Sequence, residues 1–447
     1  MHKKHFGFST TGFIMLGFVV AILAGSILLS LPISSSDGNG VSYIDALFTA
    51  TTSVCVTGLV VVPTVSAWSV FGQVIILLLI QIGGLGVITV LSALMIFVGR
   101  KMGLSDRLLI QDAFNLNTLS GLVRFVKKVI AGTFLVEAIG ALLYMTVFVP
   151  QFGLRGIWMS VFNSVSAFCN AGMDIVSGSS MCDYSGNFVI NAVTCALIIL
   201  GGMGYIVWWD VIWNVRRKKG FRYLSLHSKI SLCTTLVLLI FGTFVFFVCE
   251  YNNPETMGGF SIPHKLMASF FQSVTTRTAG FASIAQENLT NASTLASLFL
   301  MFVGGSPVGT AGGIKTVTVA VLCAAAISSV KMRSDVTLFG RSITAYTIKK
   351  AVSVFVVSFT IMFASTVLLS LVTDAELSAV LYETVSATAT VGLSKNLTPS
   401  LNVWGKLIII VTMYFGRVGP ISLAIALNRK NRSENIIKNP PEEISVG

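Results

Sequence analysis

Four short segments of the chain end at a glycine, and the glycines are regularly spaced. They are Gly58, Gly172, Gly280 and Gly392, separated by 114, 108 and 112 residues. An aromatic residue stands ten positions before each glycine: Phe48, Phe162, Phe270 and Tyr382. Glycine permits backbone angles at which successive carbonyl groups point the same way. Four such turns around one axis would form rings of carbonyl oxygens, which can replace the hydration shell of a monovalent cation.

The candidate ion-lining residues are those that end each segment. They are Cys55, Val56, Thr57 and Gly58; Cys169, Asn170, Ala171 and Gly172; Thr278, Ala279 and Gly280, preceded by Arg277; and Ala389, Thr390, Val391 and Gly392. We expect main-chain carbonyls, not side chains, to face the ion. Potassium is then the only metal expected, bound through these carbonyls. We expect no catalytic residue.

The composition indicates that these segments belong to a membrane protein. Hydrophobic residues make up 54% of the 447 residues and charged residues 11%, and the mean hydropathy is +0.84. So few charges cannot cover a water-soluble protein of this size. Stretches apolar and long enough to cross ~30 Å of hydrocarbon lie at 12–33, 67–99, 128–150, 187–213, 229–249, 292–330, 348–372 and 403–427.

The glycine-ended segments lie between these spans, at 43–58, 156–172, 263–280 and 377–392. Each is too short to cross a membrane and too apolar for an ordinary loop, which is typical of re-entrant pore helices. We therefore predict an all-α polytopic membrane protein with four tandem helix–pore loop–helix repeats around a central pore. It would have eight transmembrane helices and four re-entrant pore helices. The expected repeats are 1–100, 101–222, 223–340 and 341–447, the last with a C-terminal tail.

The charge distribution predicts the orientation. If the N-terminus is cytoplasmic, the cytoplasmic segments hold 23 Lys and Arg residues and the outer and pore segments hold five. This asymmetry follows the positive-inside rule and places both termini in the cytoplasm. The net charge of +12 therefore needs no nucleic-acid partner, and the lipid bilayer is the expected surroundings.

The sixth apolar span is interrupted between residues 304 and 315. Five glycines and a proline within twelve residues cannot form a stable helix. Such backbone at membrane depth must line a cavity or be buried in protein. We predict that this loop is a gate below the carbonyl rings, formed by Gly304, Gly305, Ser306, Pro307, Gly309, Gly312, Gly313 and Lys315, together with Arg417 of the last span.

Several other charged residues have two interpretations each. Arg277 and Glu383 are expected to brace the filter, with Arg277 bonded to carbonyls or to Glu383, whereas a direct lining charge would repel the permeant ion. Arg417 either holds the gate loop or extends its charge toward the membrane surface. Glu137 serves in a structural hydrogen bond or in a proton relay. The segment 104–122 either lies on the membrane or docks a partner.

Motifs spread over the chain resemble the membrane subunit of Ktr-type potassium uptake systems, within the Trk/Ktr/HKT superfamily. They are Ile44–Ala50, Val56–Leu59, Gln81–Gly86, Arg277–Phe281, Gly312–Lys315, Thr390–Leu393 and Gly416–Pro420. In that family a serine at the first filter position accompanies sodium preference, so glycine at all four positions implies potassium. The resemblance further implies an intramembrane gating loop, a homodimer and a cytoplasmic ring of nucleotide-binding regulatory subunits.

Under this interpretation the chain is a multi-pass protein of a bacterial plasma membrane that takes up potassium, with or without coupled sodium. It needs no cofactor of its own, and a nucleotide (ATP/ADP or an NAD-type molecule) is expected only in the partner subunit. One alternative is a sodium-selective transporter of the same superfamily. Another is the non-hydrolytic membrane subunit of an ATP-driven potassium pump. An enzyme is disfavoured, because Glu137 stands nearly alone as an acid within the spans.

Overall fold

The computed structural model describes residues 10–97, 111 and 121–419. Nearly all of its regular structure is helical. The first half contains α1 (Thr10–Leu29), α2 (Tyr43–Cys55), α3 (Thr64–Ala67), α4 (Val70–Leu85), α5 (Val87–Phe97), α7 (Leu122–Phe152), α8 (Leu154–Cys169), α9 (Phe188–Gly202) and α10 (Tyr205–Arg216). The second half contains α11 (Leu226–Glu250), α12 (Ile262–Thr275), α13 (Asn291–Phe302), α14 (Thr316–Val330), α15 (Ala345–Ser370), α16 (Leu377–Ala389) and α17 (Val403–Val418).

One short hairpin interrupts the helical pattern. Strands β1 (Thr337–Leu338) and β2 (Arg341–Ser342) pair antiparallel, with Thr337 opposite Ser342. Four single-turn 3₁₀ helices lie in connections, at Pro32–Ser34, Cys182–Tyr184, Phe221–Tyr223 and Thr398–Ser400. The hairpin was not predicted from the sequence; it is confined to the connection between α14 and α15.

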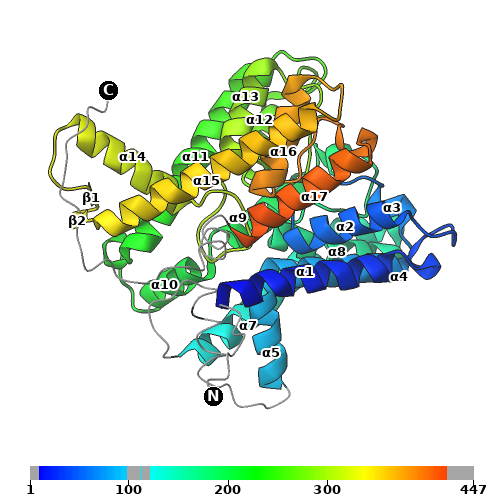
Figure 1. The fold of residues 1–447 in the computed structure, drawn as a ribbon, viewed down its shortest axis with the longest axis horizontal. Coiled ribbons are helices and arrows are strands. Elements are labelled where there is room, and N and C mark those ends of the chain that lie inside the picture. The colour runs from blue at the N-terminus through cyan, green and yellow to red at the C-terminus, as the bar shows by residue number, and fades with distance from the viewer. Residues whose placement is uncertain (1–9, 98–110, 112–120, 420–447) are drawn as a thin grey trace, which may run out of the picture.

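The helices repeat one arrangement four times. In each copy a first helix packs against a short pore helix, as α1 packs on α2, α7 on α8, α11 on α12 and α15 on α16. The second helix of each copy then packs against the pore helix of the next copy: α4 on α8, α9 on α12, α13 on α16 and α17 on α2. Figure 1 shows α17 beside α2, the contact that joins the last copy to the first. The four copies therefore close into a ring.

The predicted second helices are broken in the first two copies, which corrects the expectation of continuous spans at 67–99 and 187–213. α4 gives way to α5 at Gly86, and α9 to α10 at Met203 and Gly204, where the axis bends by 99°. Gly86, Gly204 and Gly419 share one left-handed backbone, with φ of 84°, 87° and 91°. Residues with a Cβ rarely adopt this conformation. The glycines kept in register along the sequence thus mark points at which a described helix ends.

The outer surface of the first helices is apolar. Leu142 of α7, Phe244 of α11 and Phe363 of α15 each expose more than half of their side chain. Among the described helices, α1 from Gly12, α7, α11 and α15 are each long and apolar enough to cross a membrane, and α9 with α10 qualifies as a bent pair. Large exposed apolar side chains on such helices are typical of contact with lipid.

Candidate ion-conduction site

Each pore helix ends just before a backbone turn of unusual geometry. Two residues before the glycine, Val56, Asn170, Thr278 and Thr390 adopt left-handed angles, with φ of 53°, 60°, 68° and 50°. The four glycines also have positive φ, of 95°, 67°, 79° and 96°. The residue between them does not, so the sign of φ alternates along the turn. Such alternation aligns neighbouring peptide groups, which lets their carbonyls point to one side.

The four glycines lie in one closed ring. A Cβ built on Gly58 would lie 2.5 Å from the Ala171 carbonyl oxygen, and one on Gly172 would lie 2.7 Å from that of Ala279. A Cβ on Gly280 would lie 2.6 Å from the Val391 oxygen, and one on Gly392 would collide with the Thr57 oxygen. Each turn therefore abuts the next in chain order and the fourth abuts the first. No side chain fits at any of the four positions.

Hydroxyl groups behind the turns hold them in place. Thr52 Oγ1 accepts a hydrogen bond from the Gly58 amide at 2.9 Å, and Ser386 Oγ accepts one from the Gly392 amide at 3.0 Å. Ser166 Oγ bonds the backbone of Met173, and Thr275 Oγ1 donates to the Phe281 carbonyl at 2.6 Å. Sequence reasoning missed these residues. The available signal was a hydroxyl six positions before the glycine in the first, second and fourth copies.

The third copy is one residue shorter between its aromatic anchor and its glycine. Phe48, Phe162 and Tyr382 are fully buried. Phe270, the predicted equivalent, is 38% exposed, while Phe271 is 1% exposed. The assignment of Phe270 is therefore wrong, and Phe271 takes the buried position. The supporting hydroxyl, Thr275, is shifted by the same single residue.

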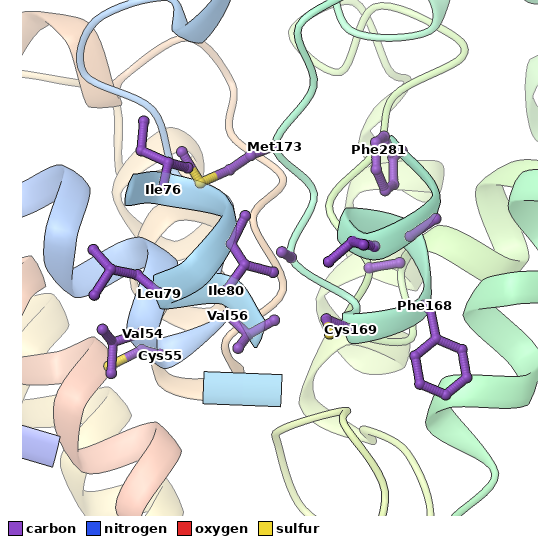
Figure 2. Close-up of a cluster of buried hydrophobic side chains, with 14 of the residues drawn as sticks. Val54, Cys55, Val56, Ile76, Leu79, Ile80, Phe168, Cys169, Met173 and Phe281 are labelled. Atoms are coloured by element: carbon purple, nitrogen blue, oxygen red, sulfur yellow. The ribbon is translucent and has the colours of Figure 1, made fainter. Parts of the chain in front are cut away.

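Apolar side chains pack the outside of the turns. Figure 2 shows Ile76, Leu79 and Ile80 of α4 beside Val54–Val56, and Met173 reaching from the second copy toward Ile76. Cys55 and Cys169 are buried free thiols, as expected for small apolar residues. This packing fixes the pore helices from behind and leaves the backbone to face the centre.

Arg277 and Glu383 do not pair with each other, which corrects one of the expected contacts. Arg277 Nη2 donates to Thr235 Oγ1 of α11 at 3.3 Å. Glu383 accepts hydrogen bonds from Ser394 Oγ at 2.7 Å and from Thr398 Oγ1. Arg277 follows the end of α12 and Glu383 lies in α16, so the two side chains belong to different copies and each bonds to its own neighbours. Glu383 fixes the segment that follows the fourth turn.

The glycine-rich stretch 304–315 forms a loop between α13 and α14. Its two ends are joined, because the Gly304 amide donates to the Ile314 carbonyl at 2.9 Å and Ser306 Oγ lies 3.1 Å from Thr316 Oγ1. Its middle packs on the break between α9 and α10. There the amides of Ser306 and Thr310 donate to the carbonyls of Gly202 and Gly201.

The remaining gate residues lie against the same break or under the fourth turn. The Pro307 carbonyl and Gly309 are in close approach to Gly204, and Gly305 lies beside Gly202. Gly312 and Gly313 lie against Ala389 and Thr390. A Cβ on Gly312 would collide with Thr390 Oγ1. Glycine thus allows the loop to sit directly beneath the ring of turns.

Two basic side chains hold the loop. Arg417 of α17 donates one hydrogen bond to the Thr310 carbonyl and another to the Gly83 carbonyl of α4. Lys315 Nζ donates to the Ala311 carbonyl at 2.6 Å and lies 3.4 Å from that of Gly312. Three successive loop carbonyls are therefore bonded to cationic groups. This arrangement favours the interpretation in which Arg417 contacts the loop.

Glu137 of α7 lies in a structural hydrogen bond. Its carboxylate accepts from Gln81 Nε2 of α4 at 3.1 and 3.3 Å, and its backbone carbonyl accepts from Ser164 Oγ at 2.6 Å. The contact ties the first two copies together behind the second turn. The segment 104–122, expected either to lie on the membrane or to dock a partner, falls almost entirely outside the described residues.

The fold and this arrangement of turns and loop define a membrane transport protein for cations. The chain belongs to the TrkH family, whose description is "cation transport protein" and whose match covers residues 9–439. This family consists of transporters, not enzymes, and the resemblance found in the motifs is confirmed.

Named relatives are similar over nearly the whole chain. The chain is 39% identical to "Ktr system potassium uptake protein B" of Bacillus subtilis over 433 residues, 97% of this chain and 95% of that protein. It is 38% identical to "Potassium/sodium uptake protein NtpJ" of Enterococcus hirae over 437 residues, 96% of each. The crystal structure of the potassium transporter TrkH from Vibrio parahaemolyticus superposes with a TM-score of 0.77 at 16% identity, covering 96% of this chain and 87% of that one. The similarity to this crystal structure is a similarity of fold alone.

Proposed function

We propose that the chain takes up potassium across a bacterial plasma membrane through the ring of four turns. The observation that carries the proposal is the cyclic contact of the four glycines, each against a carbonyl of the next copy. Carbonyl oxygens so placed can substitute for the water shell of a dehydrated cation. The ion-binding groups are then the main-chain carbonyls of the turns that end at Gly58, Gly172, Gly280 and Gly392.

Potassium is favoured over sodium as the selected ion. Glycine stands at all four ring positions, and two relatives of near-full-length similarity carry potassium in their names. The name of the Enterococcus hirae relative also includes sodium, which favours a sodium-coupled variant of the same function. A membrane subunit of an ATP-driven pump is disfavoured by the family to which the chain belongs.

The proposed transmembrane topology rests on the same ring of four turns. Eight transmembrane crossings and four re-entrant helices, with both termini cytoplasmic, agree with the positive-inside distribution of Lys and Arg. The proposed repeats at 1–100, 101–222, 223–340 and 341–447 would each hold one first helix, one pore helix and one second helix. The second helices of the first three copies are broken near Gly86, Gly204 and residues 304–315.

We assign the gate to the loop 304–315. It lies against the fourth turn and is bonded by Arg417 and Lys315. Regulation would come from a cytoplasmic ring of nucleotide-binding subunits, and two copies of the chain would form a homodimer. The "Ktr system" in a relative's name supports a multi-subunit assembly.

Growth rescue tests the proposal. The chain should restore growth of a potassium-uptake-deficient bacterium at low potassium, and parallel cultures with and without sodium test the coupling. Rescue that depends on sodium supports the coupled variant; rescue of a sodium-uptake defect alone supports the sodium-selective alternative.

Deletion of residues 308–311, the middle of the loop, should raise the ion flux if the loop is the gate. Unchanged flux would count against that role.

A further inference from the structure

The connection between α10 and α11 carries positive charge that no nearby acid opposes. Between residues 211 and 249 the sequence holds no Asp or Glu and six basic residues, which are Arg216, Arg217, Lys218, Lys219, Arg222 and Lys229. The other two basic connections, 100–128 and 331–350, each contain aspartate. In the part of the chain that the structure describes, the one ion pair joins Lys406 to Asp45. None of the six basic residues therefore has a carboxylate partner among the described residues.

The bend between α9 and α10 places this connection at a membrane surface. α9 has 15 residues and is about 22 Å long at 1.5 Å per residue, so it crosses most of a hydrocarbon layer of ~30 Å. α10 then turns away by 99°. In the proposed orientation α9 runs inward from the outer surface. α10 therefore lies in the inner leaflet, close to the plane of the membrane.

One face of α10 alternates aromatic rings with cations. Trp209 and Trp213 are four residues apart and so share a face of the helix. Lys128 Nζ of α7 lies 5.2 Å from the centre of the Trp209 ring, and Arg217 Cζ lies 3.8 Å from that of Trp213. An aromatic ring attracts a cation over its face. Tryptophan is also enriched where a membrane meets water.

Two cations gather about the exposed Trp213 ring. Lys219 Nζ lies 6.0 Å from the centre of this ring, which Arg217 already covers, and 5.1 Å from the centre of the Tyr223 ring. Trp213 is 49% exposed and Tyr223 64% exposed, and every residue from 216 to 223 is exposed. The two cations and the two rings are thus open to the surroundings at one place.

Hydrogen bonds fold the connection back onto α10. The Ser225 amide donates to Asp210 Oδ2 at 2.9 Å, and Lys229 Nζ donates to the Arg222 carbonyl at 2.7 Å. Asp210 Oδ1 accepts a further hydrogen bond from Asn214 Nδ2 at 3.0 Å. Asp210, the acid next to the cluster in the sequence, thus bonds the backbone and an amide. It holds the basic residues in place and leaves their charge unopposed.

We propose that the end of α10 and the α10–α11 connection bind the phosphate headgroup of an anionic phospholipid in the inner leaflet. Arg217 and Lys219 would contact the phosphate, while Trp213 and Tyr223 would lie at the level of the headgroups. The inference rests on the proposed orientation of the chain and not on the ion that it carries. Clusters of four to eight basic residues beside the cytoplasmic end of a membrane helix favour anionic lipid, by about 1 kcal/mol for each residue.

A lipid fits this surface better than an acidic protein does. The rings and the cations are exposed together, on a helix that runs along the membrane in the proposed orientation. A phospholipid offers both an acyl boundary for the rings and an anion for the cations. An acidic face of a cytoplasmic partner would match the cations alone. Binding of such a partner is therefore the competing outcome of the test.

The test measures lipid binding to the purified full-length chain in detergent by native mass spectrometry. The chain is titrated with dioleoylphosphatidylglycerol, and with dioleoylphosphatidylcholine, which has the same acyl chains and no net charge. The test variant is Arg217→Gln with Lys219→Gln. The matched control is Lys331→Gln with Lys349→Gln, which removes two exposed charges at the end of α14 and the start of α15. Equal melting temperatures without lipid show that the variants are folded.

We expect the wild type and the control to bind the anionic lipid with a half-saturating concentration about tenfold or more below that of the neutral lipid. The test variant should lose this preference. Equal binding of the two lipids by the wild type overturns the inference, as does an unchanged preference in the test variant or an equal loss in the control. Displacement of the anionic lipid by millimolar inorganic phosphate would point to a soluble anion instead.

Two further measurements separate the competing explanations. A test variant that keeps its lipid preference but no longer co-purifies with a cytoplasmic protein retained by the wild type would make this surface a protein interface, and would overturn the inference. Failure of the wild type to rescue growth at low potassium would overturn the proposed function. A preference for anionic lipid that Arg217→Gln with Lys219→Gln abolishes would still support the lipid site.

Discussion

At the residue scale, the backbone turn after each pore helix depends on contacts that the linear sequence hides. Ser386 lies six residues before Gly392 and accepts a hydrogen bond from its amide. This bond fixes the Gly392 amide, and the carbonyls of the ring belong to the neighbouring peptide groups. The same arrangement recurs at Thr52 and Gly58. Side-chain hydroxyls thus replace the helical partners that the turn loses at the end of each pore helix.

Substitution Ser386→Ala should weaken the fourth turn. The loss of one buried hydrogen bond costs about 1 kcal/mol, so potassium should protect the variant less against thermal unfolding than it protects the wild type. Ser378→Ala in the half-buried first turn of the same helix serves as the control. Equal potassium-dependent shifts in melting temperature for both variants and the wild type would show that the hydroxyl does not support the turn.

In the proposed orientation Asp174 lies at the outer mouth, where it predicts a pH dependence of uptake. It follows Gly172 by two residues, and its carboxylate accepts hydrogen bonds from the Val176 and Ser177 amides. Burial raises the pKa of Asp174 to about 6, although these hydrogen bonds oppose the shift. The side chain is therefore charged above that pH and neutral below it. A negative charge near the mouth concentrates cations.

Acidification from pH 7.5 to 5.5 on the outer side should thus raise the half-saturating potassium concentration by about two- to threefold. Asn in place of Asp174 should give the higher value at both pH values, in uptake measured with intact cells. If Asp174→Asn kept the full pH dependence of the wild type, another group would have to be responsible.

Sequence reasoning succeeded at this scale where the four copies share residue types. The glycines Gly58, Gly172, Gly280 and Gly392 could be located because their spacing repeats. The buried aromatic of the third copy could not, since an alignment on glycine cannot reveal that one residue is missing before it. Phe270 and Phe271 are both aromatic, and burial alone separates them.

At the scale of elements, breaks in the second helices create the site for the loop. The loop is bonded to the carbonyls of Gly201 and Gly202 at the end of α9, and the Tyr205 amide at the start of α10 donates to the Val308 carbonyl at 3.0 Å. The glycine and proline content of 304–315 predicted the loss of helix there. The breaks near Gly86 and Gly204 were missed, because glycine within an apolar helix is more often a packing residue.

Arg417 joins three elements through its hydrogen bonds to the loop and to α4. Substitution Arg417→Gln removes the positive charge and one of the two N–H donors that bond the carbonyls of the loop and of α4. Bonds to charged groups contribute about 1.5–3 kcal/mol each, so the population of the released loop should rise by about tenfold or more. Rubidium flux into proteoliposomes should increase accordingly.

Arg341→Gln, on the exposed hairpin, is the control for the charge change. Its flux should equal that of the wild type. A flux in Arg417→Gln at or below the wild-type value would mean that this arginine does not hold the loop closed.

At the scale of the whole molecule, the ring closes through contacts between the first and last copies. Lys406 of α17 forms an ion pair with Asp45 of α2, with Nζ 2.6 Å from Oδ1. Asp45 also accepts a hydrogen bond from Ser42, the residue that caps α2. The pair connects residues 361 positions apart. No local sequence pattern could have predicted it, although the fourfold repeat already predicted that the copies surround one axis.

Asp45→Asn should loosen this junction and lower the apparent melting temperature, because a partly buried ion pair contributes about 1 kcal/mol. The charge exchange Asp45→Lys with Lys406→Asp should recover part of the loss, whereas either single reversal should be worse than Asp45→Asn. Melting temperatures of the purified variants check this order. Equal stability for single reversals and the exchange would show that the pair does not join the copies.

The central claim is that the closed ring of glycine turns selects potassium. Potassium and sodium fluxes into proteoliposomes test it most directly, with the wild type, Gly392→Ser and the control Gly178→Ser, whose added Cβ meets no neighbouring atom within 4 Å. We predict that the wild type and the control favour potassium by about tenfold or more, a difference of 1.4 kcal/mol. In Gly392→Ser, where a side chain would collide with the Thr57 carbonyl, this preference should be lost. A Gly392→Ser protein with unchanged preference for potassium would contradict the account.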